Sequence, residues 1–225
     1  MSIIGARARY GSVVFDVDST LSAIEGVDWL AERRDASVAA QIRVMTERAM
    51  AGLIPLEAVY RERLDLIRPT RAEIAELALA YIDAVQPGAR ALCEELDLAG
   101  CAVVLLSGGL RQAILPLARH LGVAPDDVHA VEIDFTDDGT CSGLRGEQVL
   151  ATQQGKPKML HALRAELERP LVMVGDGSTD AATRGVSDAF IAFTGVTRRA
   201  NVVAVADAEA IDFASLHSLL FENAP

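Results

Sequence analysis

Short apolar runs separated by amphipathic stretches dominate the hydrophobic pattern of this chain. The apolar runs have the length and β-branched content of buried strands, and we place them at 13–15, 101–106, 128–135, 171–175, 189–193 and 202–205. Helical periodicity fills most of the intervals, at Gly88 to Ala99, Leu110 to Leu121, Lys158 to Leu167 and Ala208 to Phe221. Because strands that alternate with helices form βαβ units, the pattern predicts an α/β fold with a mostly parallel sheet flanked by helices.

The segment 22–85 departs from this alternation. It contains no convincing strand, and its four amphipathic stretches lie at Val27–Glu32, Ser37–Met50, Leu56–Leu66 and Arg71–Ala84. We interpret it as a helical cap domain inserted into a Rossmann-like core domain, which residues 1–21 and 86–225 form. A second exception surrounds Asp138-Gly139, where the Asp-Gly pair predicts the turn of a β-hairpin.

Composition narrows the classes of protein without identifying a function. A hydrophobic fraction of 51% with only 4% aromatic residues implies a core of Ala, Val, Leu and Ile, which suits parallel strands and packed helices. The net charge of −11 argues against nucleic-acid or membrane partners, since phosphate contacts need clustered Lys and Arg. The sequence predicts a cytoplasmic protein, because its cysteines lack metal-like spacing, its first residues lack a signal-peptide pattern and it has no apolar run of about 20 residues.

Acidic residues at strand ends are the first candidates for chemistry. One apolar run leads directly into Asp16 and Asp18, and another ends at Asp176 and Asp180. Ligands of open α/β sheets bind beyond the carboxyl ends of the strands, so these acids are placed for catalysis. Taken alone, each acidic cluster also fits an ordinary solvated turn.

Two further loops carry groups that can bind phosphate. Ser107, Gly108 and Gly109 follow strand 101–106 at a helix entrance, where a hydroxyl and backbone amides can cradle a phosphate. Lys156 precedes another helix, where a lysine can neutralise a phosphoryl oxygen but also fits a solvated surface. Both signals are weak until they are combined with the acids.

Together the four loops suggest hydrolysis of a phosphate monoester. Asp16 and Asp176 can supply carboxylate oxygens to Mg²⁺, whose charge offsets the repulsion between a carboxylate and a phosphate. Asp16 would attack phosphorus to give an aspartyl-phosphate, while Asp18 protonates the leaving alkoxide and later activates water. Ser107 and Lys156 would hold the phosphoryl oxygens.

The ordered set of motifs resembles the haloacid dehalogenase superfamily, from about Val13 to about Phe193. The set comprises Asp16-x-Asp18-Ser19-Thr20, Ser107-Gly108-Gly109, Lys156 and Gly175-Asp176-Gly177-x-Thr179-Asp180. Within this superfamily, the inserted segment is similar to that of the phosphoserine phosphatases. The similarity rests on Glu25-Gly26-x-Asp28, Met45-Thr46-x-Arg48-Ala49-Met50-x-Gly52 and Glu62-Arg63-Leu64-x-Leu66-Ile67.

The resemblance implies an Mg²⁺-dependent phosphatase of serine biosynthesis that hydrolyses O-phospho-L-serine through an aspartyl-phosphate. Its partner would be a small phosphorylated amino acid, with no nucleic acid and no membrane, and the assembly could be a homodimer. By the same resemblance, Glu25 would meet the substrate ammonium and Arg63 its carboxylate, and Met50 would shield the site from water. Leu56 stands where the family often has a phenylalanine over the site.

The resemblance also assigns roles in the core. The backbone carbonyl of Asp18 would be a metal ligand beside the carboxylates of Asp16 and Asp176. Thr179 would contact the substrate together with Ser107, Gly108 and Gly109. Asp180 would orient Lys156 or metal-bound water rather than touch the substrate.

Several of these assignments have plainer alternatives. Arg63 lies in a run of alternating charges that fits an exposed helix face. Glu25 could stabilise the first turn of the next helix, and Met50 could be ordinary core packing. For the function, the alternatives are a related phosphatase or phosphotransferase acting on another small phosphometabolite such as phosphohomoserine, and a signalling receiver. A receiver would need neither Asp18 nor a helical cap.

Overall fold

A six-stranded sheet forms the centre of the computed structural model, which describes residues 7–222 apart from the side chain of Met50. The strand order is β3-β2-β1-β6-β7-β8, and each neighbouring pair is parallel. The strands are β1 (Ser12–Phe15), β2 (Ala102–Leu110), β3 (Val128–Val131), β6 (Leu171–Gly175), β7 (Ala189–Phe193) and β8 (Ala208–Ala210). The predicted α/β class with a mostly parallel sheet is confirmed.

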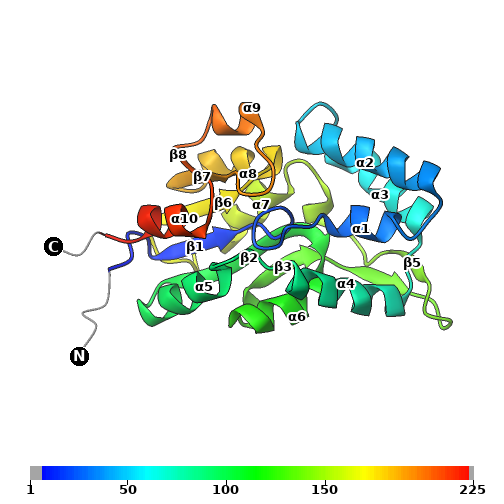
Figure 1. Ribbon diagram of the computed structural model, residues 1–225, viewed down its shortest axis with the longest axis horizontal. Coiled ribbons are helices and arrows are strands. Elements are labelled where there is room, and N and C mark those ends of the chain that lie inside the picture. Colours follow the sequence, from blue (N-terminus) through cyan, green and yellow to red (C-terminus); the bar gives the residue numbers. More distant parts are fainter. Residues whose placement is uncertain (1–6, 223–225) are drawn as a thin grey trace.

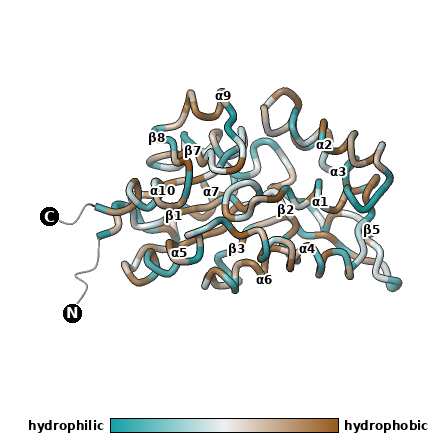
Figure 2. The backbone as a smooth tube through the Cα atoms, in the orientation of Figure 1, coloured by the Kyte–Doolittle hydropathy of each residue, from teal (hydrophilic) through white to brown (hydrophobic). Residues whose placement is uncertain are grey.

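Helices cover both faces of this sheet (Figure 1). One face carries α5 (Ala89–Leu98) and α6 (Arg111–Leu121), and the other carries α7 (Gly155–Leu163) and α8 (Ser178–Ala181). The central strand β1 is therefore apolar on both sides, and its residues Val13, Val14 and Phe15 are fully buried. Hydrophobic residues concentrate along these central strands (Figure 2).

Four helices inserted after β1 lie beyond the carboxyl ends of the strands (Figure 1). They are α1 (Gly26–Ala31), α2 (Ala36–Met50), α3 (Leu56–Ile67) and α4 (Arg71–Asp83), and we call them the inserted helices. This confirms the helical content predicted for the segment 22–85, while its division from the core as a separate domain stays a prediction. Among the described residues, no helix is both long and apolar enough to cross a membrane.

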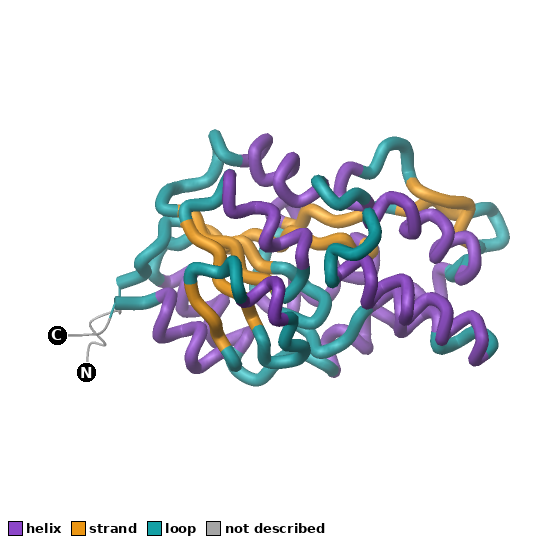
Figure 3. The backbone as a smooth tube through the Cα atoms, turned by 90° about the horizontal axis from the view of Figure 1, so that it is seen from above, coloured by secondary structure: helices purple, strands orange, loops and turns teal. Residues whose placement is uncertain are grey.

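The predicted strand 128–135 is two strands in different sheets. It breaks at Glu132, whose N–H donates to the side chain of Gln148. After the break, β4 (Ile133–Phe135) pairs with β5 (Cys141–Leu144) in an antiparallel hairpin that lies apart from the main sheet (Figure 3). The hairpin itself is confirmed. The single-strand prediction was wrong because an apolar run does not mark where a strand changes its partner.

The C-terminal elements also differ from the prediction. The segment 202–205 is not a strand: α9 (Ala200–Val203) and a turn occupy it, although its valines have high β propensity. The helix predicted from Ala208 to Phe221 is also wrong at its start, where β8 forms instead and pairs with β7. Helix α10 (Phe213–Leu220) starts only after Asp212, whose side chain accepts a hydrogen bond from the N–H of Ser215 as an N-cap. Helix α7 likewise begins and ends earlier than the predicted 158–167.

Candidate active site

The ends of two neighbouring strands bring the predicted acids together. Asp16 follows β1, where its N–H donates to the carbonyl of Val174 at 2.9 Å, and Asp176 follows β6. Carboxylate oxygens of Asp16, Asp176 and Asp180 lie within 4.8 Å of one another, and all three residues are buried. Buried carboxylates in such a cluster form a donor set that fits a hard divalent cation. The side chain of Asp18 lies outside this cluster, and the role predicted for its carbonyl stays a prediction.

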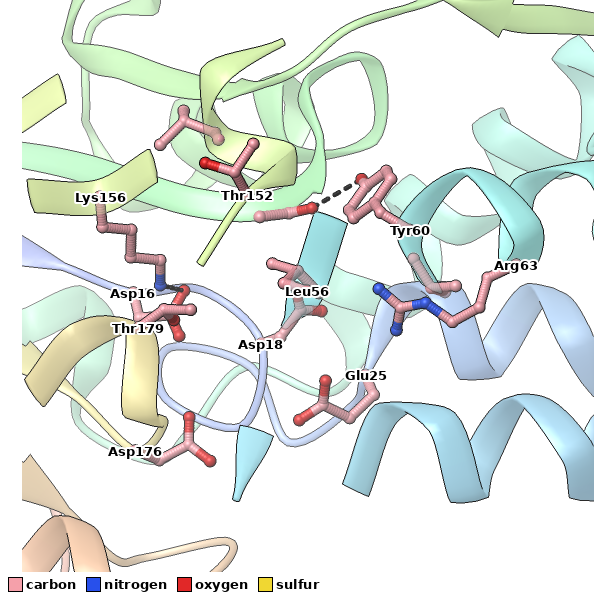
Figure 4. Close-up of a pocket in the computed structure, with 13 residues that line it drawn as sticks. Asp16, Asp18, Glu25, Leu56, Tyr60, Arg63, Thr152, Lys156, Asp176 and Thr179 are labelled. Carbon is pink, nitrogen blue, oxygen red and sulfur yellow. Dashed lines mark hydrogen bonds and ion pairs between the residues drawn. The ribbon is translucent and has the colours of Figure 1, made fainter. Parts of the chain in front are cut away.

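Lys156 lies between two of these carboxylates, and its contact with Asp16 is drawn in Figure 4. Its Nζ is 2.7 Å from Asp16 Oδ1 and 2.6 Å from Asp180 Oδ1, and the residue is only 4% exposed. Burial alone would lower the pKa of the amine, but the charges of Asp16 and Asp180 raise the pKa of Lys156 above its usual range. The lysine is therefore a buried cation at the site, and the surface alternative is wrong.

Asp180 fits under this site because Gly175 has no side chain. A Cβ at Gly175 would lie 2.3 Å from Asp180 Cγ, so a larger residue would displace the carboxylate. Asp180 Oδ2 accepts a hydrogen bond from the Gly177 N–H at 2.9 Å, which leaves Oδ1 for Lys156. This contact is the one expected of a residue that orients Lys156, although the role itself stays a prediction.

Asp176 has a partner that the sequence analysis missed. The guanidinium of Arg199, from the segment between β7 and α9, forms an ion pair with Asp176 Oδ2. Arg199 carries no local motif, and only the packing of this segment beside the end of β6 reveals it. The arginine adds a second cation to a site that is otherwise rich in carboxylates.

Asp18 has a different environment from Asp16. Its Oδ1 accepts hydrogen bonds from the Gly26 N–H and the Tyr81 hydroxyl, each at 2.7 Å. Burial, followed by the charge of Asp16, raises the pKa of Asp18 to about 6. A carboxyl group that titrates near neutrality can both give and take a proton, as the predicted acid and base role requires.

The loop predicted to cradle phosphate is a continuation of β2. The strand runs through Ser107, Gly108 and Gly109, with a shift of register between Leu106 and Leu110. The Gly109 N–H donates to Ser107 Oγ at 2.9 Å, and Gly108 lines the pocket. Of the three predicted residues, only Gly108 lines the pocket, while Ser107 and Gly109 are buried behind it in an irregular strand end. Their contact with the substrate stays a prediction.

Glu25 reaches the same pocket from the start of α1. Its Oε1 accepts a hydrogen bond of 2.6 Å from the Ser19 hydroxyl. Ser19 has a positive φ of 53°, so the chain turns sharply after β1 and returns Glu25 toward the strand end. Burial, followed by the charge of Asp18, raises the pKa of Glu25 to about 7.

Arg63 points inward from α3. It is 3% exposed, and its Nη1 donates to Thr46 Oγ1 at 2.8 Å, while the Thr46 hydroxyl donates to Asp28 Oδ1 at 2.6 Å. Its Nε has no hydrogen-bond partner among the described residues. The exposed-helix alternative for Arg63 is therefore wrong. Arg63 also lines the pocket, where its guanidinium can pair with an anionic group of a bound ligand.

The pocket formed by these residues lies between β1, α3 and α7 (Figure 4). Its predicted members are Asp16, Asp18, Glu25, Arg63, Gly108, Lys156, Asp176 and Thr179, and Leu56 also lines it. Sequence analysis missed Val27, Tyr60, Leu150 and Thr152. The helical spacing of Leu56, Tyr60 and Arg63 places them on one face of α3 and could have revealed Tyr60. The side chain of Met50 lies outside the described part of the structure.

Comparison with known proteins identifies the family. The family model described as haloacid dehalogenase-like hydrolase matches residues 13–183. The chain belongs to this family. The superfamily predicted from the ordered motifs is therefore confirmed, and the pocket lies where those motifs converge in this haloacid dehalogenase-like hydrolase.

Relatives of this chain carry the narrower name of phosphoserine phosphatase. The phosphoserine phosphatase of Bos taurus is 34% identical over 212 residues, which are 94% of this chain and 93% of the relative. A solved phosphoserine phosphohydrolase-like protein from Francisella tularensis has a TM-score of 0.86 at 26% identity, covering 92% of this chain and 98% of its own. A substrate-bound phosphoserine phosphatase complex has a TM-score of 0.79 at 25% identity, covering 94% of this chain and 99% of its own.

Proposed function

We propose that this haloacid dehalogenase-like hydrolase converts O-phospho-L-serine to L-serine and phosphate. The observation that carries the proposal is the buried guanidinium of Arg63, a residue that lines the same pocket as Asp16 and Lys156. Glu25 lines this pocket as well. An amino acid ester of phosphate would present a carboxylate to Arg63 and an ammonium to Glu25 while its phosphoryl group meets the core residues. The identity to named phosphoserine phosphatases supports the same substrate.

In the first step, a carboxylate oxygen of Asp16 forms a bond to phosphorus and the bond from phosphorus to the serine oxygen breaks. Asp18 gives its proton to that serine oxygen, so L-serine leaves as the neutral alcohol. Lys156, held by Asp16 and Asp180, stabilises the charge on the phosphoryl oxygens. The result is a phosphorylated Asp16 and an ionised Asp18.

In the second step, Asp18 accepts a proton from a water molecule. The water oxygen forms a bond to phosphorus, and the bond between phosphorus and the Asp16 oxygen breaks. Phosphate leaves, Asp16 returns as a carboxylate and Asp18 is protonated again. The same carboxyl group thus acts as acid and then as base, which suits its raised pKa.

A divalent cation fits the donor set of the site, and we propose Mg²⁺. The carboxylates of Asp16 and Asp176, together with the backbone carbonyl of Asp18, would hold it. When bound, the ion supplies positive charge that reduces the repulsion between the phosphate and the Asp16 carboxylate. The pairing of Asp176 Oδ2 with Arg199 leaves its other carboxylate oxygen as a ligand.

Replacing Arg63 with Ala tests the substrate assignment. We expect kcat/KM for phosphoserine to fall by roughly 10²-fold or more, because a charge-assisted pair with the substrate carboxylate is lost together with its positioning. An aryl phosphate without a carboxylate should change far less, since its phosphoryl group still meets Asp16 and Lys156. Steady-state phosphate release with both substrates measures the difference.

Arg61→Ala is the matched control, because Arg61 is exposed on the same helix. It should leave both substrates unchanged. Equal losses on both substrates in Arg63→Ala would mean that Arg63 supports the fold generally. A panel of phosphorylated amino acids and sugars, assayed with an acceptor present, then distinguishes phosphoserine hydrolysis from action on phosphohomoserine or phosphotransfer.

A further inference from the structure

Tyr81 lies behind Asp18 without lining the pocket. It is fully buried near the end of α4, and its hydroxyl donates to Asp18 Oδ1 at 2.7 Å. The N–H of Gly26, at the start of α1, donates to the same oxygen at 2.7 Å. The two donors come from the first and last inserted helices, and both meet on one oxygen of the carboxyl group.

The lack of a side chain at Gly26 makes this arrangement possible. A Cβ at position 26 would lie 2.0 Å from the Tyr81 hydroxyl oxygen and 2.8 Å from its Cζ. Any larger residue would therefore push the tyrosine ring away from Asp18. Gly26 therefore allows the Tyr81 hydroxyl to pack closely against the Asp18 carboxyl group.

The second oxygen of Asp18 has a different neighbour. Asp18 Oδ2 lies against Gly109, where an added Cβ would be 2.8 Å from it, and Gly109 follows the pocket residue Gly108. The same Cβ would be 3.1 Å from Ser107 Oγ. Oδ1 therefore faces two hydrogen-bond donors, and Oδ2 faces the segment that is placed to meet the phosphoryl group.

We propose that Tyr81 is a positioning residue that, with the Gly26 N–H, fixes Asp18 so that its proton is carried on Oδ2. An oxygen that already accepts two hydrogen bonds is a poor place for a proton, because both donors point their own hydrogens at it. The proton then lies on the oxygen nearest the phosphate segment, where the leaving alkoxide forms. This inference rests on the proposed function for the acid and base role of Asp18.

The backbone carbonyl of Tyr81 accepts a hydrogen bond of its own, independent of the one that its hydroxyl donates. The Ser22 hydroxyl donates to the Tyr81 carbonyl at 3.1 Å, where the chain crosses between the core and the inserted helices. Nearby, the N–H of Gln86 donates to the Leu21 carbonyl at 2.9 Å. Ser22→Ala therefore weakens this crossing without removing a donor to Asp18, and it is a matched control for the loss of the Tyr81 hydroxyl.

The test is Tyr81→Phe, assayed with Mg²⁺ on phosphoserine and on 4-nitrophenyl phosphate. We expect kcat/KM for phosphoserine to fall by about 10- to 100-fold, because the lost hydrogen bond would strengthen as Asp18 gives up its proton and becomes a charged carboxylate. The aryl ester should change by less than about threefold, because nitrophenolate leaves without a proton and kcat/KM reports only the steps up to its departure. Ser22→Ala should keep the wild-type ratio between the two substrates.

A double-mutant cycle with Asp18→Asn provides a second readout. If Tyr81 acts through Asp18, Tyr81→Phe should cause no further loss on phosphoserine once the carboxyl group is an amide. Gly26→Ala, which displaces the hydroxyl without deleting it, should reproduce the selective loss on phosphoserine. Thermal unfolding shows whether each variant is folded before its rates are compared.

Equal losses on the two substrates, an unchanged rate on phosphoserine, or additive losses in the cycle would overturn the role of Tyr81. Failure of the wild-type protein to release phosphate from phosphoserine would instead overturn the proposed function. In that case a simple alkyl phosphate replaces phosphoserine in the comparison. A selective loss on the alkyl ester still supports the positioning role, and absence of hydrolysis of either ester by the wild-type protein overturns it.

Discussion

Replacing Asp16 with Asn is expected to lower phosphate release from phosphoserine by on the order of 10⁴-fold or more, as is typical when a nucleophile is removed. The amide is a poor nucleophile and a weaker ligand for a hard cation. It keeps the size of the side chain, and the Val17 N–H, which donates to Asp16 Oδ1 at 2.7 Å, can donate to the amide oxygen. Lys156 keeps its contact with Asp180. The fold should therefore survive.

Continuous assay of phosphate release measures this effect, and thermal unfolding checks that the variant is folded. Asp65→Asn is the matched control, because Asp65 is an exposed aspartate of α3, and it should keep wild-type activity. Turnover of Asp16→Asn above about a hundredth of the wild-type rate would rule out covalent catalysis by Asp16.

Removal of divalent cations should lower activity by on the order of 10³-fold or more, and added Mg²⁺ should restore it. A bound cation contributes several kcal/mol of charge stabilisation, and each 1.4 kcal/mol corresponds to about a factor of ten in rate. The carboxylates of Asp16, Asp176 and Asp180 lie within 4.8 Å of one another, so an arriving phosphate would add charge to an acidic cluster. Assays in excess chelator, before and after adding Mg²⁺, measure the effect.

Binding of Mg²⁺ can also be measured without turnover, by thermal unfolding of the protein. A ligand that binds the folded state alone raises the temperature of unfolding, so Mg²⁺ should stabilise the wild-type protein and stabilise Asp176→Asn less. The exposed Asp65→Asn variant should respond like the wild type. Full activity in excess chelator would show that the reaction does not need a divalent cation.

Local sequence patterns were sufficient for the core of the fold. The run Val13–Phe15 is buried on both faces and so is apolar at every position, which predicts a central strand without reference to the rest of the chain. Asp16 follows that strand directly, so its place at the sheet edge also follows from the sequence. The same reasoning failed at Val202 and Val203, where tertiary packing overrode the β propensity of valine and formed α9.

The environment of each site residue depended on contacts that no local pattern encodes. Alternating charges around Arg63 fit an exposed helix face as well as a buried one, and the packing of α3 over the site decided between them. Tyr81 and Asp18 are 63 positions apart, and Arg199 and Asp176 belong to different βα segments. Periodicity and turn chemistry act within one segment, whereas these pairs form only when separate segments pack together. The sequence by itself therefore determined the central strands, the place of Asp16 at the sheet edge and the family. The tertiary structure decided which groups surround each carboxyl group, because burial and long-range hydrogen bonds arise from packing.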